Sequence, residues 1–483
     1  MSVGRARATP ARNEAAAVRL QIKGRHRDMS TGAGIGTAAG GQTGQRVVIL
    51  GAGFAGLQAA KSLGRRGIPV TVIDRQNHHL FQPLLYQVAT AALSAPDIAE
   101  PIRSILRRYP SVEVLLGDVV RIDTGRRQVH CAHGAVVAYD WLILATGAVT
   151  GYFGHDDWSR VAPGLKTIED ARRIRTRVLM SFEHAERCTD PEERARLMTI
   201  AVIGGGPTGV ELSGALAELA RFTLVRDFRH IRPDAARVLL VEAGPRLLGP
   251  FQEASADYAR QRLERLGVRV MTGRGVEAIT AESLTLEGET LPVGLVIWAA
   301  GVTASPLARQ LGEVDRGGRI AVNERLEVVG QSRVLAMGDV ALCPGEDGRP
   351  LPGLAQVAKQ QGQHLGRSLG AHLASGAPLE PFTYRSCGNT SIVGRHAAVY
   401  ETDRHRLSGW PAWALWAVVH VYLLVGFQNR IVVSFQWLWR YLTYHRGSRL
   451  ISMSEIGPEE AATLGEPTAA EETPGVRGAG SRP

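Results

Sequence analysis

Short runs of apolar residues recur along this chain, each followed by glycines and then by a segment rich in alanine and leucine. The first run, 46–50, precedes Gly51-Ala52-Gly53-Phe54-Ala55-Gly56, and a second run at 69–73 ends in Asp74. A buried strand, a tight turn, a helix and a second strand produce this pattern. We therefore predict a β–α–β unit over residues 46–74.

This unit has the features of a dinucleotide site. Glycines let the backbone turn sharply and approach a pyrophosphate, and the free N–H groups at a helix N-terminus attract its charge. Asp74 follows about twenty residues after the turn, where an acid holds a ribose hydroxyl. A glycine pattern alone is weak evidence, and the alternative is a glycine-rich turn in another α/β unit. The strand, helix and acid together favour nucleotide binding.

The same pattern returns in the middle of the chain. A strand at 198–203 is followed by Gly204-Gly205-Gly206-Pro207-Thr208-Gly209 and Glu211, and a strand at 237–241 ends in Glu242. This spacing exceeds the usual distance of roughly twenty residues, so we predict an insertion and interpret it as an extended helix across Arg221–Pro233. Two units indicate two nucleotides, and an acid after each second strand favours an unphosphorylated ribose.

Other strands and helices follow from the same pattern. We predict strands at 112–116 and 119–122, a charged helix at 168–186, and buried strands within 139–147, 295–301 and 333–339 that end in small residues or an acid. Small residues there would let the backbone lie against a dinucleotide, although they also suit ordinary strand ends. A helix begins near Leu354 and carries Gln356 and Gln360 on one face. Residues 381–400 alternate loosely, which predicts strands.

The C-terminal region differs from the rest. No Asp or Glu occurs from Arg404 to Ser454, and this segment contains Trp410, Trp413, Trp416, Trp437 and Trp439. Pro411–Phe427 is nearly all apolar, and 431–445 has one apolar helical face. With arginines nearby, this composition predicts an anchor that lies in a membrane interface. A transmembrane hairpin, which needs spans of roughly 20 residues, and a buried dimer interface are the alternatives.

Both ends of the chain predict disorder. Residues 1–44 are rich in Arg, Gly and Ala without apolar periodicity, and the tail 455–483 is acidic and rich in Pro and Ala. The first segment has no apolar core of a secretory signal, although its arginines are also typical of a mitochondrial transit peptide. Met29 offers a later start, so translation of residues 1–28 stays open.

Charge and cysteines narrow the class of protein. The net charge of +10 suits an anionic membrane or nucleic acid, but no segment combines basic and aromatic residues as nucleic-acid surfaces do, so we favour the membrane. Cys131, Cys188, Cys343 and Cys387 are scattered. Their spacing indicates a reducing compartment and predicts no metal site.

Several of these segments resemble one family, the type II NADH:quinone oxidoreductases, which belong to the flavoproteins with two dinucleotide-binding domains. The resemblance spans residues 46–452 and rests on 77–90 with Leu93-Ser94 and Asp97-Ile98-Ala99, on 204–211, on Ala355–Gln360, and on 423–430. Asn389-Thr390-Ser391 departs from the small apolar residues more common in the family, which makes quinone contacts in the C-terminal region less certain.

The resemblance implies an α/β fold with two Rossmann-like domains, the NADH-binding domain inserted in the FAD-binding domain, and a membrane-anchoring region with amphipathic helices. The implied boundaries are 45–165 and 305–378 for the FAD domain, 166–304 for the NADH domain and 379–454 for the quinone-side anchor domain. It also implies hydride transfer from NADH to non-covalent FAD and then reduction of menaquinone or ubiquinone, without proton pumping. The expected location is the cytoplasmic face of a bacterial membrane, bound peripherally, with a homodimer as an option.

The resemblance assigns roles to individual residues. Glu211 would lie near the nicotinamide and flavin, with charge complementarity to the helix N-terminus as the alternative role; Gln356 and Gln360 would line the quinone pocket. The residues expected to bind FAD or NADH are Gly51, Ala52, Gly53, Phe54, Ala55, Gly56, Asp74, Arg75, Ala145, Thr146, Gly147, Gly204, Gly206, Pro207, Thr208, Gly209, Glu242, Ala300, Gly301, Gly338, Asp339, Ala355 and Gln356. Asp339 would hold the ribityl chain of the flavin.

Three other flavoprotein functions are alternatives. Dithiol reductases of this superfamily need a cysteine pair after the first helix, and residues 57–95 contain no Cys. Sulfide:quinone oxidoreductases share the fold and the anchor, but they need reactive cysteines and no NADH, whereas the second glycine unit with Glu242 is intact here. A signalling flavoprotein of the apoptosis-inducing-factor type is the third alternative, and Gln356, Gln360 and the anchor favour enzymatic turnover instead.

Overall fold

The computed structural model describes residues 45–424, 430–435, 437 and 448–451. The predictions for residues 1–44, for the tail 455–483, for Trp439 and for most of 423–430 and 431–445 therefore fall outside the described residues.

The first β–α–β unit forms as predicted. Strand β1 (Val47–Leu50) leads into helix α1 (Phe54–Gly64), which returns to β2 (Val70–Asp74). These strands belong to a parallel five-stranded sheet of order β20-β9-β1-β2-β5, completed by β5 (Val112–Leu116), β9 (Trp141–Leu144) and β20 (Val334–Ala336). Every residue of β1 and β9 is buried because helices cover both faces of the sheet.

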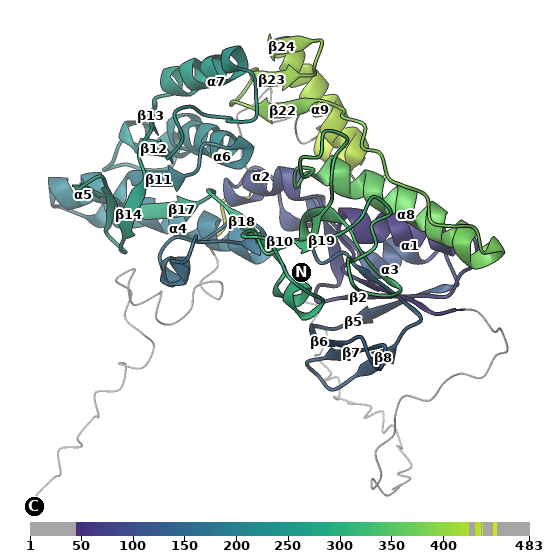
Figure 1. The fold of residues 1–483 in the computed structure, drawn as a ribbon. Coiled ribbons are helices and arrows are strands. Elements are labelled where there is room, and N and C mark those ends of the chain that lie inside the picture. The colour runs from purple at the N-terminus through teal and green to yellow at the C-terminus, as the bar shows by residue number, and fades with distance from the viewer. Residues whose placement is uncertain (1–44, 425–429, 436, 438–447, 452–483) are drawn as a thin grey trace, which may run out of the picture. The chain divides into compact units, whose positions relative to one another are not determined.

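Helix α8 (Ala355–Ser375) lies along α1 (Figure 1). Glycines permit this close approach: a Cβ on Gly362 would lie 2.1 Å from the carbonyl oxygen of Ala55, and one on Gly366 would lie 2.9 Å from that of Ala59. The small residues of α1 thus pack directly against a second helix, which positions the N-terminus of α8 near the end of β20.

The second unit has its own parallel sheet, of order β13-β12-β11-β17. Its strands are β11 (Thr199–Ile203), β12 (Arg237–Glu242), β13 (Val268–Thr272) and β17 (Leu295–Trp298), and its helices are α6 (Pro207–Glu218) and α7 (Glu253–Arg265). The chain therefore folds as two Rossmann-like α/β units, with the second between two parts of the first in sequence. The domain boundaries given above stay predictions.

Helix α4 (Ile168–Arg187) precedes the second unit and begins at a capping box. The hydroxyl of Thr167 accepts the N–H of Asp170, whose carboxylate accepts the N–H of Thr167. Helix α5 (Pro191–Leu197) follows, with Asp190 as its N-cap. The charged helix predicted at 168–186 is confirmed.

The insertion after α6 is not the extended helix that we predicted across Arg221–Pro233. Helix α6 continues as a π-helical turn, Leu219–Thr223, and a 3-10 turn, Leu224–Arg226, and only a second 3-10 turn, Pro233–Ala235, precedes β12. Pro233 starts this last turn, since proline cannot supply the N–H that a longer helix would need there.

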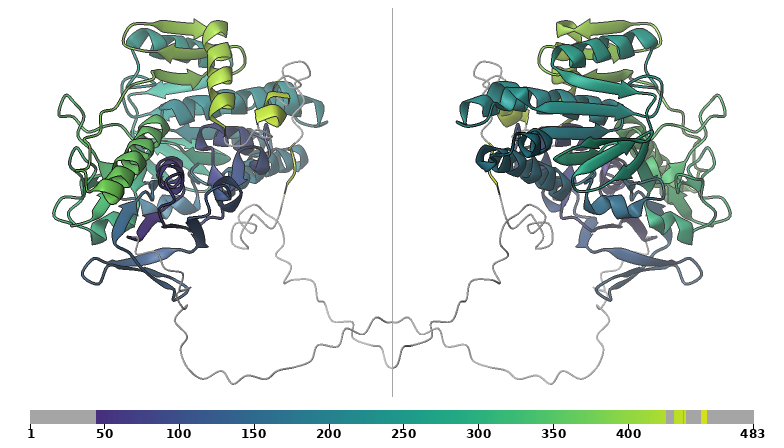
Figure 2. Two further views of the ribbon diagram at one scale, coloured as in Figure 1. Left: turned by 90° about the vertical axis from the view of Figure 1, so that its right-hand side faces the viewer. Right: turned by 90° about the vertical axis from the view of Figure 1, so that its left-hand side faces the viewer.

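The C-terminal part holds a three-stranded antiparallel sheet and one long helix. The strands are β22 (Asn389–Ile392), β23 (Ala398–Glu401) and β24 (Arg406–Gly409), and α9 (Trp410–Leu423) follows directly. The strands predicted within 381–400 therefore form only after residue 388. Figure 2 shows this yellow-green sheet beside α7 of the second unit.

Shorter elements complete the described chain. They are β3 (His78–Leu80), α2 (Leu85–Ala89), β4 (Ala99–Pro101), α3 (Ile102–Leu106), β6 (Val119–Asp123), β7 (Gln128–Cys131), β8 (Val136–Ala138), β10 (Ala148–Thr150), β14 (Val276–Ile279), β15 (Ser283–Leu286), β16 (Glu289–Pro292), β18 (Val302–Ala304), β19 (Ile320–Ala321) and β21 (Ala341–Leu342). Strands β10 and β18 pair antiparallel where the chain passes between the two units.

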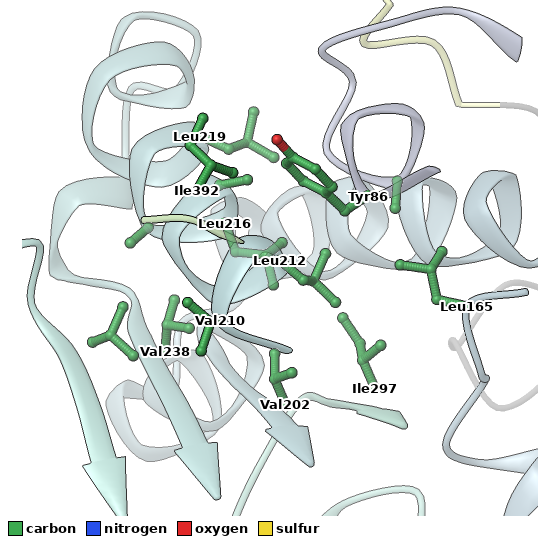
Figure 3. Packing of buried hydrophobic residues seen from close by; sticks show 14 of the residues in the cluster. Tyr86, Leu165, Val202, Val210, Leu212, Leu216, Leu219, Val238, Ile297 and Ile392 are labelled. Carbon is green, nitrogen blue, oxygen red and sulfur yellow. The ribbon is translucent and has the colours of Figure 1, made fainter. Parts of the chain in front are cut away.

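One apolar cluster joins the second unit to both α2 and the C-terminal region. In Figure 3, Tyr86 of α2 faces Leu212 and Leu216 of α6, with Ile392 of β22 alongside. Trp416 of α9 belongs to the same cluster and is 2% exposed. In the described part of the chain, no helix combines the length and apolar character needed to cross a bilayer.

Candidate active site

A cavity of about 560 Å³ opens where the carboxyl ends of the two parallel sheets meet. The turns after β1, β2, β9 and β20 line it, together with the N-termini of α4, α6 and α8. Ligands of open α/β sheets bind at this edge. The cavity is therefore the candidate active site.

The turn after β1 is shaped to leave backbone N–H groups accessible. Gly51 has φ +97°, and a Cβ on Gly56 would lie 1.9 Å from the Gly51 carbonyl oxygen. No heavy atom lies within 4 Å of an ideal Cβ on Gly53. Gly51 and Gly56 are thus required by the turn itself, whereas Gly53 leaves open space beside the helix N-terminus.

Asp74 braces this turn from the end of β2. Its Oδ2 accepts the N–H of Ala52 at 2.6 Å, and its Oδ1 accepts that of Gln76 at 2.8 Å. Burial raises the pKa of Asp74, and the two N–H donors oppose the rise. Nδ1 of His79 lies 2.9 Å from the Ala52 carbonyl oxygen, and burial lowers the pKa of His79 to about 4.

The turn after β11 repeats these contacts. Gly204 has φ +109°, and a Cβ on Gly209 would lie 1.8 Å from its carbonyl oxygen. Glu242 accepts the N–H of Gly205 and that of Gly244, both at 2.6 Å. The second acid therefore holds the second glycine turn as Asp74 holds the first.

Glu211 lies between the main cavity and a smaller one. It is 9% exposed, and its Oε1 accepts the N–H of Ile392 at 3.3 Å. Burial raises the pKa of Glu211 to about 8, against the opposing effect of that N–H donor. Glu211 and Tyr86 line both cavities.

The smaller cavity, about 140 Å³, is lined by aromatic side chains. Trp413 and Trp416 of α9 and Trp437 surround it together with Tyr86 and Gln87 of α2. Trp416 and Trp437 are stacked with ring centroids 5.3 Å apart, and the indole N–H of Trp437 donates to Oε1 of Gln87 at 3.0 Å. The cavity is thus enclosed jointly by α2 and the predicted anchor, which the sequence pattern alone did not reveal.

The two glutamines of α8 hold a loop in place. The amide of Gln356 donates to the carbonyl of Gly388 and accepts the N–H of Cys387, and that of Gln360 makes the same pair of bonds with Arg385. Next to them, Ala355 and Ala358 line the main cavity. Both glutamines therefore fix the backbone of 385–388, which leads into β22.

Lys166 is a cavity residue that the sequence analysis missed. It precedes the N-cap of α4, and burial lowers its pKa while the carboxylate of Asp339 opposes the fall. The rarity of lysine in this sequence was the available clue, since the 56 lysines and arginines include few lysines.

Comparison with known proteins assigns the family. A family model described as pyridine nucleotide-disulphide oxidoreductase matches residues 45–362. The chain is 41% identical to type II NADH:quinone oxidoreductase Ndh of Mycobacterium tuberculosis, over 84% of this chain and 90% of that protein. The chain belongs to the type II NADH:quinone oxidoreductases. It is also 40% identical to NdhA of the same organism, over 91% of this chain and 95% of that protein.

A solved structure shares the family fold. NDH2 of Plasmodium falciparum in complex with NADH superimposes with a TM-score of 0.77 at 21% identity, covering 84% of this chain and 99% of that one. Cys131, Cys188, Cys343 and Cys387 are all free, and none of them lines the main cavity.

Most residues proposed for this family's cofactor site meet at the main cavity. Its lining includes Gly51, Ala52, Gly53, Phe54, Ala55, Asp74, Arg75, Ala145, Thr146, Gly147, Pro207, Thr208, Glu211, Gly301, Gly338, Asp339 and Ala355. The others do not line it: Gly56 lies in α1, Gly209 in α6, Glu242 at the end of β12, Gln356 and Gln360 in α8, and Gly204, Gly206 and Ala300 in the adjoining turns. Within the described residues, no group of three His, Cys, Asp or Glu side chains is placed to hold a metal ion.

Proposed function

We propose that the protein oxidises NADH through bound FAD and passes two electrons to a membrane quinone, without moving protons across the membrane. One observation carries the proposal: an acid holds each of the two glycine turns, the first turn and the N-terminus of α6 line one cavity, and Glu211 joins that cavity to an aromatic one beside the predicted anchor.

The residues of the first unit suit FAD. Gly53 leaves room for a pyrophosphate at the N-terminus of α1, and Asp74 is placed for a ribose. Thr146 lines the cavity, and its buried hydroxyl makes no hydrogen bond with described residues, so a bound ligand would be its partner. Bound FAD would supply the hydride acceptor and the two-electron carrier; Asp339 would hold its ribityl chain.

The second unit would bind NADH. Gly206 leaves the same open space at the N-terminus of α6. Glu242 would accept hydrogen bonds from the adenosine ribose and repel a 2′-phosphate, which favours NADH over NADPH. Pro207 and Thr208 bring this helix terminus to the main cavity, where the nicotinamide would meet the flavin.

Glu211 is suited to hold a proton beside both cavities. With a pKa of about 8, its carboxyl is mostly protonated at neutral pH, so it can donate a proton toward quinol formation. Gln356 and Gln360 would shape the quinone site by fixing residues 385–388 beside Ala355. The aromatic cavity would be the approach for the quinone from the membrane, since the predicted anchor supplies its tryptophans.

The membrane association is peripheral in this proposal. Large apolar side chains of α9, Val418 (68% exposed) and Tyr422 (69% exposed), face outward in a segment without acids. They would enter the headgroup region of an anionic leaflet. Because NADH is a cytosolic substrate, the cytoplasmic face of a bacterial membrane is the proposed location.

A steady-state assay tests the activity. Protein purified in detergent should contain FAD that heat releases, and should oxidise NADH, but poorly NADPH, when a short-chain ubiquinone or menaquinone analogue is supplied. Turnover with sulfide instead of NADH would favour a sulfide:quinone oxidoreductase. NADH binding without quinone turnover would favour a signalling flavoprotein.

A variant of Gln356 tests the quinone side. Gln356→Ala should slow flavin reoxidation by quinone about tenfold, the scale expected when a backbone segment loses two hydrogen bonds, while flavin reduction by NADH stays fast. Gln363→Ala on the same helix is the control. Equal slowing of both half-reactions would assign Gln356 to the flavin site instead.

A further inference from the structure

The insertion between α6 and β12 has one buried side and one exposed side. Leu219, Ala220, Thr223 and Leu224 are buried, whereas Phe222 and Val225 are 43% and 39% exposed. Arg226, Arg229 and Arg232 are exposed as well. We call Phe222, Val225, Arg226, Arg229 and Arg232 the insertion face. Two large apolar side chains bordered by arginines are typical of surfaces that lie in a membrane interface.

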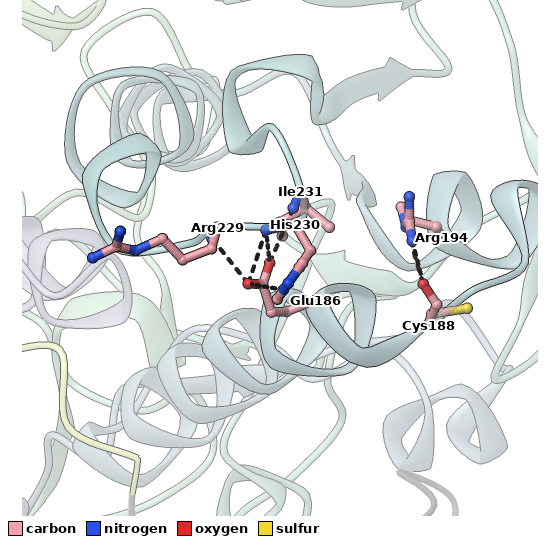
Figure 4. Close-up of polar contacts among 6 residues, drawn as sticks. All are labelled: Glu186, Cys188, Arg194, Arg229, His230 and Ile231. Carbon is pink, nitrogen blue, oxygen red and sulfur yellow. Dashed lines mark hydrogen bonds and ion pairs between the residues drawn. The ribbon is translucent and has the colours of Figure 1, made fainter.

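The part of the insertion face that carries Arg229 is held to α4. Figure 4 shows the carboxylate of Glu186, near the end of α4, accepting the backbone N–H groups of Arg229, His230 and Ile231, with the His230 ring also bound. The Arg229 side chain extends away from this contact. Partial burial by itself raises the pKa of Glu186, but these hydrogen-bond donors have the larger, opposite effect. The pKa of Glu186 is therefore lowered to about 2. The loop thus keeps its shape at physiological pH.

The local charge is positive. Asp227 forms an ion pair with Arg449, and Asp234 forms one with Arg232 at 2.9 Å. Both acids of the insertion are therefore compensated, and Arg221, Arg226 and Arg229 supply its net positive charge. An anionic surface is the complementary partner.

The insertion contacts the proposed membrane anchor. Asp227 of the insertion pairs with Arg449, and Thr223 lines the aromatic cavity together with Trp413 and Trp437. In the C-terminal segment, the apolar side chains of Ile431 and Phe435 are also 54% and 65% exposed.

We propose that the insertion face binds the anionic phospholipid headgroups of a bilayer, as a second contact beside the C-terminal anchor. This inference rests on the peripheral membrane association in the proposed function. Phe222 and Val225 enter the headgroup region, and Arg226 and Arg229 bind lipid phosphates. The two contacts flank the aromatic cavity, so its mouth is held against lipid, where a quinone can enter.

Vesicle binding by the FAD-loaded full chain tests the charge contribution. On phosphatidylcholine vesicles containing phosphatidylglycerol, Arg226→Gln with Arg229→Gln should weaken binding about 30-fold, as expected for two basic residues near an anionic surface. The matched control, Arg107→Gln with Arg108→Gln, changes two exposed arginines of the first unit. It should change binding less than twofold. Equal weakening in both pairs would mean that only net charge matters and would overturn the proposal.

A depth measurement tests the apolar contribution. In a background with Cys188→Ser and Cys387→Ser, an environment-sensitive label is attached to a cysteine introduced by Val225→Cys, Val418→Cys or Val136→Cys. Val136 is 50% exposed on β8 of the first unit and serves as control. On anionic vesicles carrying quencher lipids, the labels at 225 and 418 should be quenched and the label at 136 should not.

The outcomes separate this inference from the proposed function. Quenching at 418 without quenching at 225 would overturn the insertion contact and leave the C-terminal anchor in place. Quenching at neither position would overturn both membrane contacts. The catalytic proposal is measured independently, by NADH oxidation with a water-soluble quinone in the absence of vesicles.

Discussion

The turn after β1 and the turn after β11 use the same contacts. In each unit, the acid at the end of the second strand accepts two backbone N–H groups. Asp74 accepts that of Ala52 in the turn and that of Gln76, two residues after the acid itself. Glu242 accepts those of Gly205 and Gly244 in the same way. The helices differ in what covers them. The glycines of α8 pack on α1, whereas α2 and β22 cover α6.

This difference appears at one helix position. Counting from the glycines, Gln58 of α1 corresponds to Glu211 of α6. Gln58 is half-buried, while Glu211 is buried against β22 between two cavities. The shared contacts hold both glycine turns, and the different covering layers bury Glu211 of the second helix, for which we propose the role of a proton carrier that the first helix lacks.

The largest predicted effect comes from matched glycines of the two turns. Gly53→Ala should give protein that retains little FAD, whereas Gly206→Ala should keep FAD and raise the KM for NADH about tenfold, the effect of overpacking worth about 1–3 kcal/mol. Neither Cβ contacts protein atoms within 4 Å, so folding should be preserved. Flavin absorbance per protein and steady-state kinetics measure the two effects. If Gly206→Ala lost FAD and Gly53→Ala did not, the assignment of the two units would be reversed.

Replacing Glu211 with glutamine, the residue type found at the corresponding position 58 of α1, should stabilise the protein at high pH. Its folded-state pKa of about 8 lies above the ordinary 4.5, so the folded protein holds an extra proton between these values. Stability then falls as the pH rises through this interval. Glu211→Gln should remove this loss, gaining on the order of a few kcal/mol above pH 8 and little below pH 4.5.

Thermal unfolding from pH 5 to 9 measures this effect. Glu242→Gln is the control, because Glu242 is a partly exposed acid bound by two N–H groups. A wild-type stability profile unchanged by Glu211→Gln would mean that Glu211 is ionised throughout. In kinetics, the same variant should lower the rate of quinol formation.

The selectivity for NADH over NADPH should depend on Glu242 and not on Asp74. Glu242→Gln combined with Ala243→Arg should shift the kcat/KM ratio of NADH to NADPH toward NADPH by about 10- to 100-fold, the range for hydrogen bonds to a charged group. Asp74→Asn should leave the ratio unchanged and affect FAD retention instead. Equal wild-type kcat/KM for the two nucleotides would contradict the role of Glu242.

The smallest effect is expected at Glu186. Its pKa of about 2 means that stability from this carboxylate is present above pH 4.5 and is lost as the pH falls toward 2. Glu186→Gln should leave NADH oxidation by soluble quinone unchanged at pH 7 but increase hydrogen exchange of residues 229–231. Protection equal to wild type would show that other contacts hold this loop.

The repeated pattern of apolar strand, glycines and acid was sufficient to predict both Rossmann-like units, because the last glycine of each turn is fixed by the nearby carbonyl of the first, Gly51 or Gly204. The insertion could not be predicted in the same way. Its π-helical turn depends on packing of Leu219 and Leu224 against the core, and its loop on Glu186, which is remote in sequence.

Nor could the sequence show that the amides of Gln356 and Gln360 bind the backbone of 385–388, or that Lys166 lines the cavity.

The most direct test of the central claim is an anaerobic double-mixing stopped-flow experiment on the FAD-containing protein. NADH is mixed first, and a quinone is added after the flavin has been reduced. The account predicts that NADH bleaches the flavin absorbance in one fast phase and that quinone restores it at a rate matching steady-state turnover. Flavin that stays oxidised with NADH, or that stays reduced after quinone is added, would contradict the account.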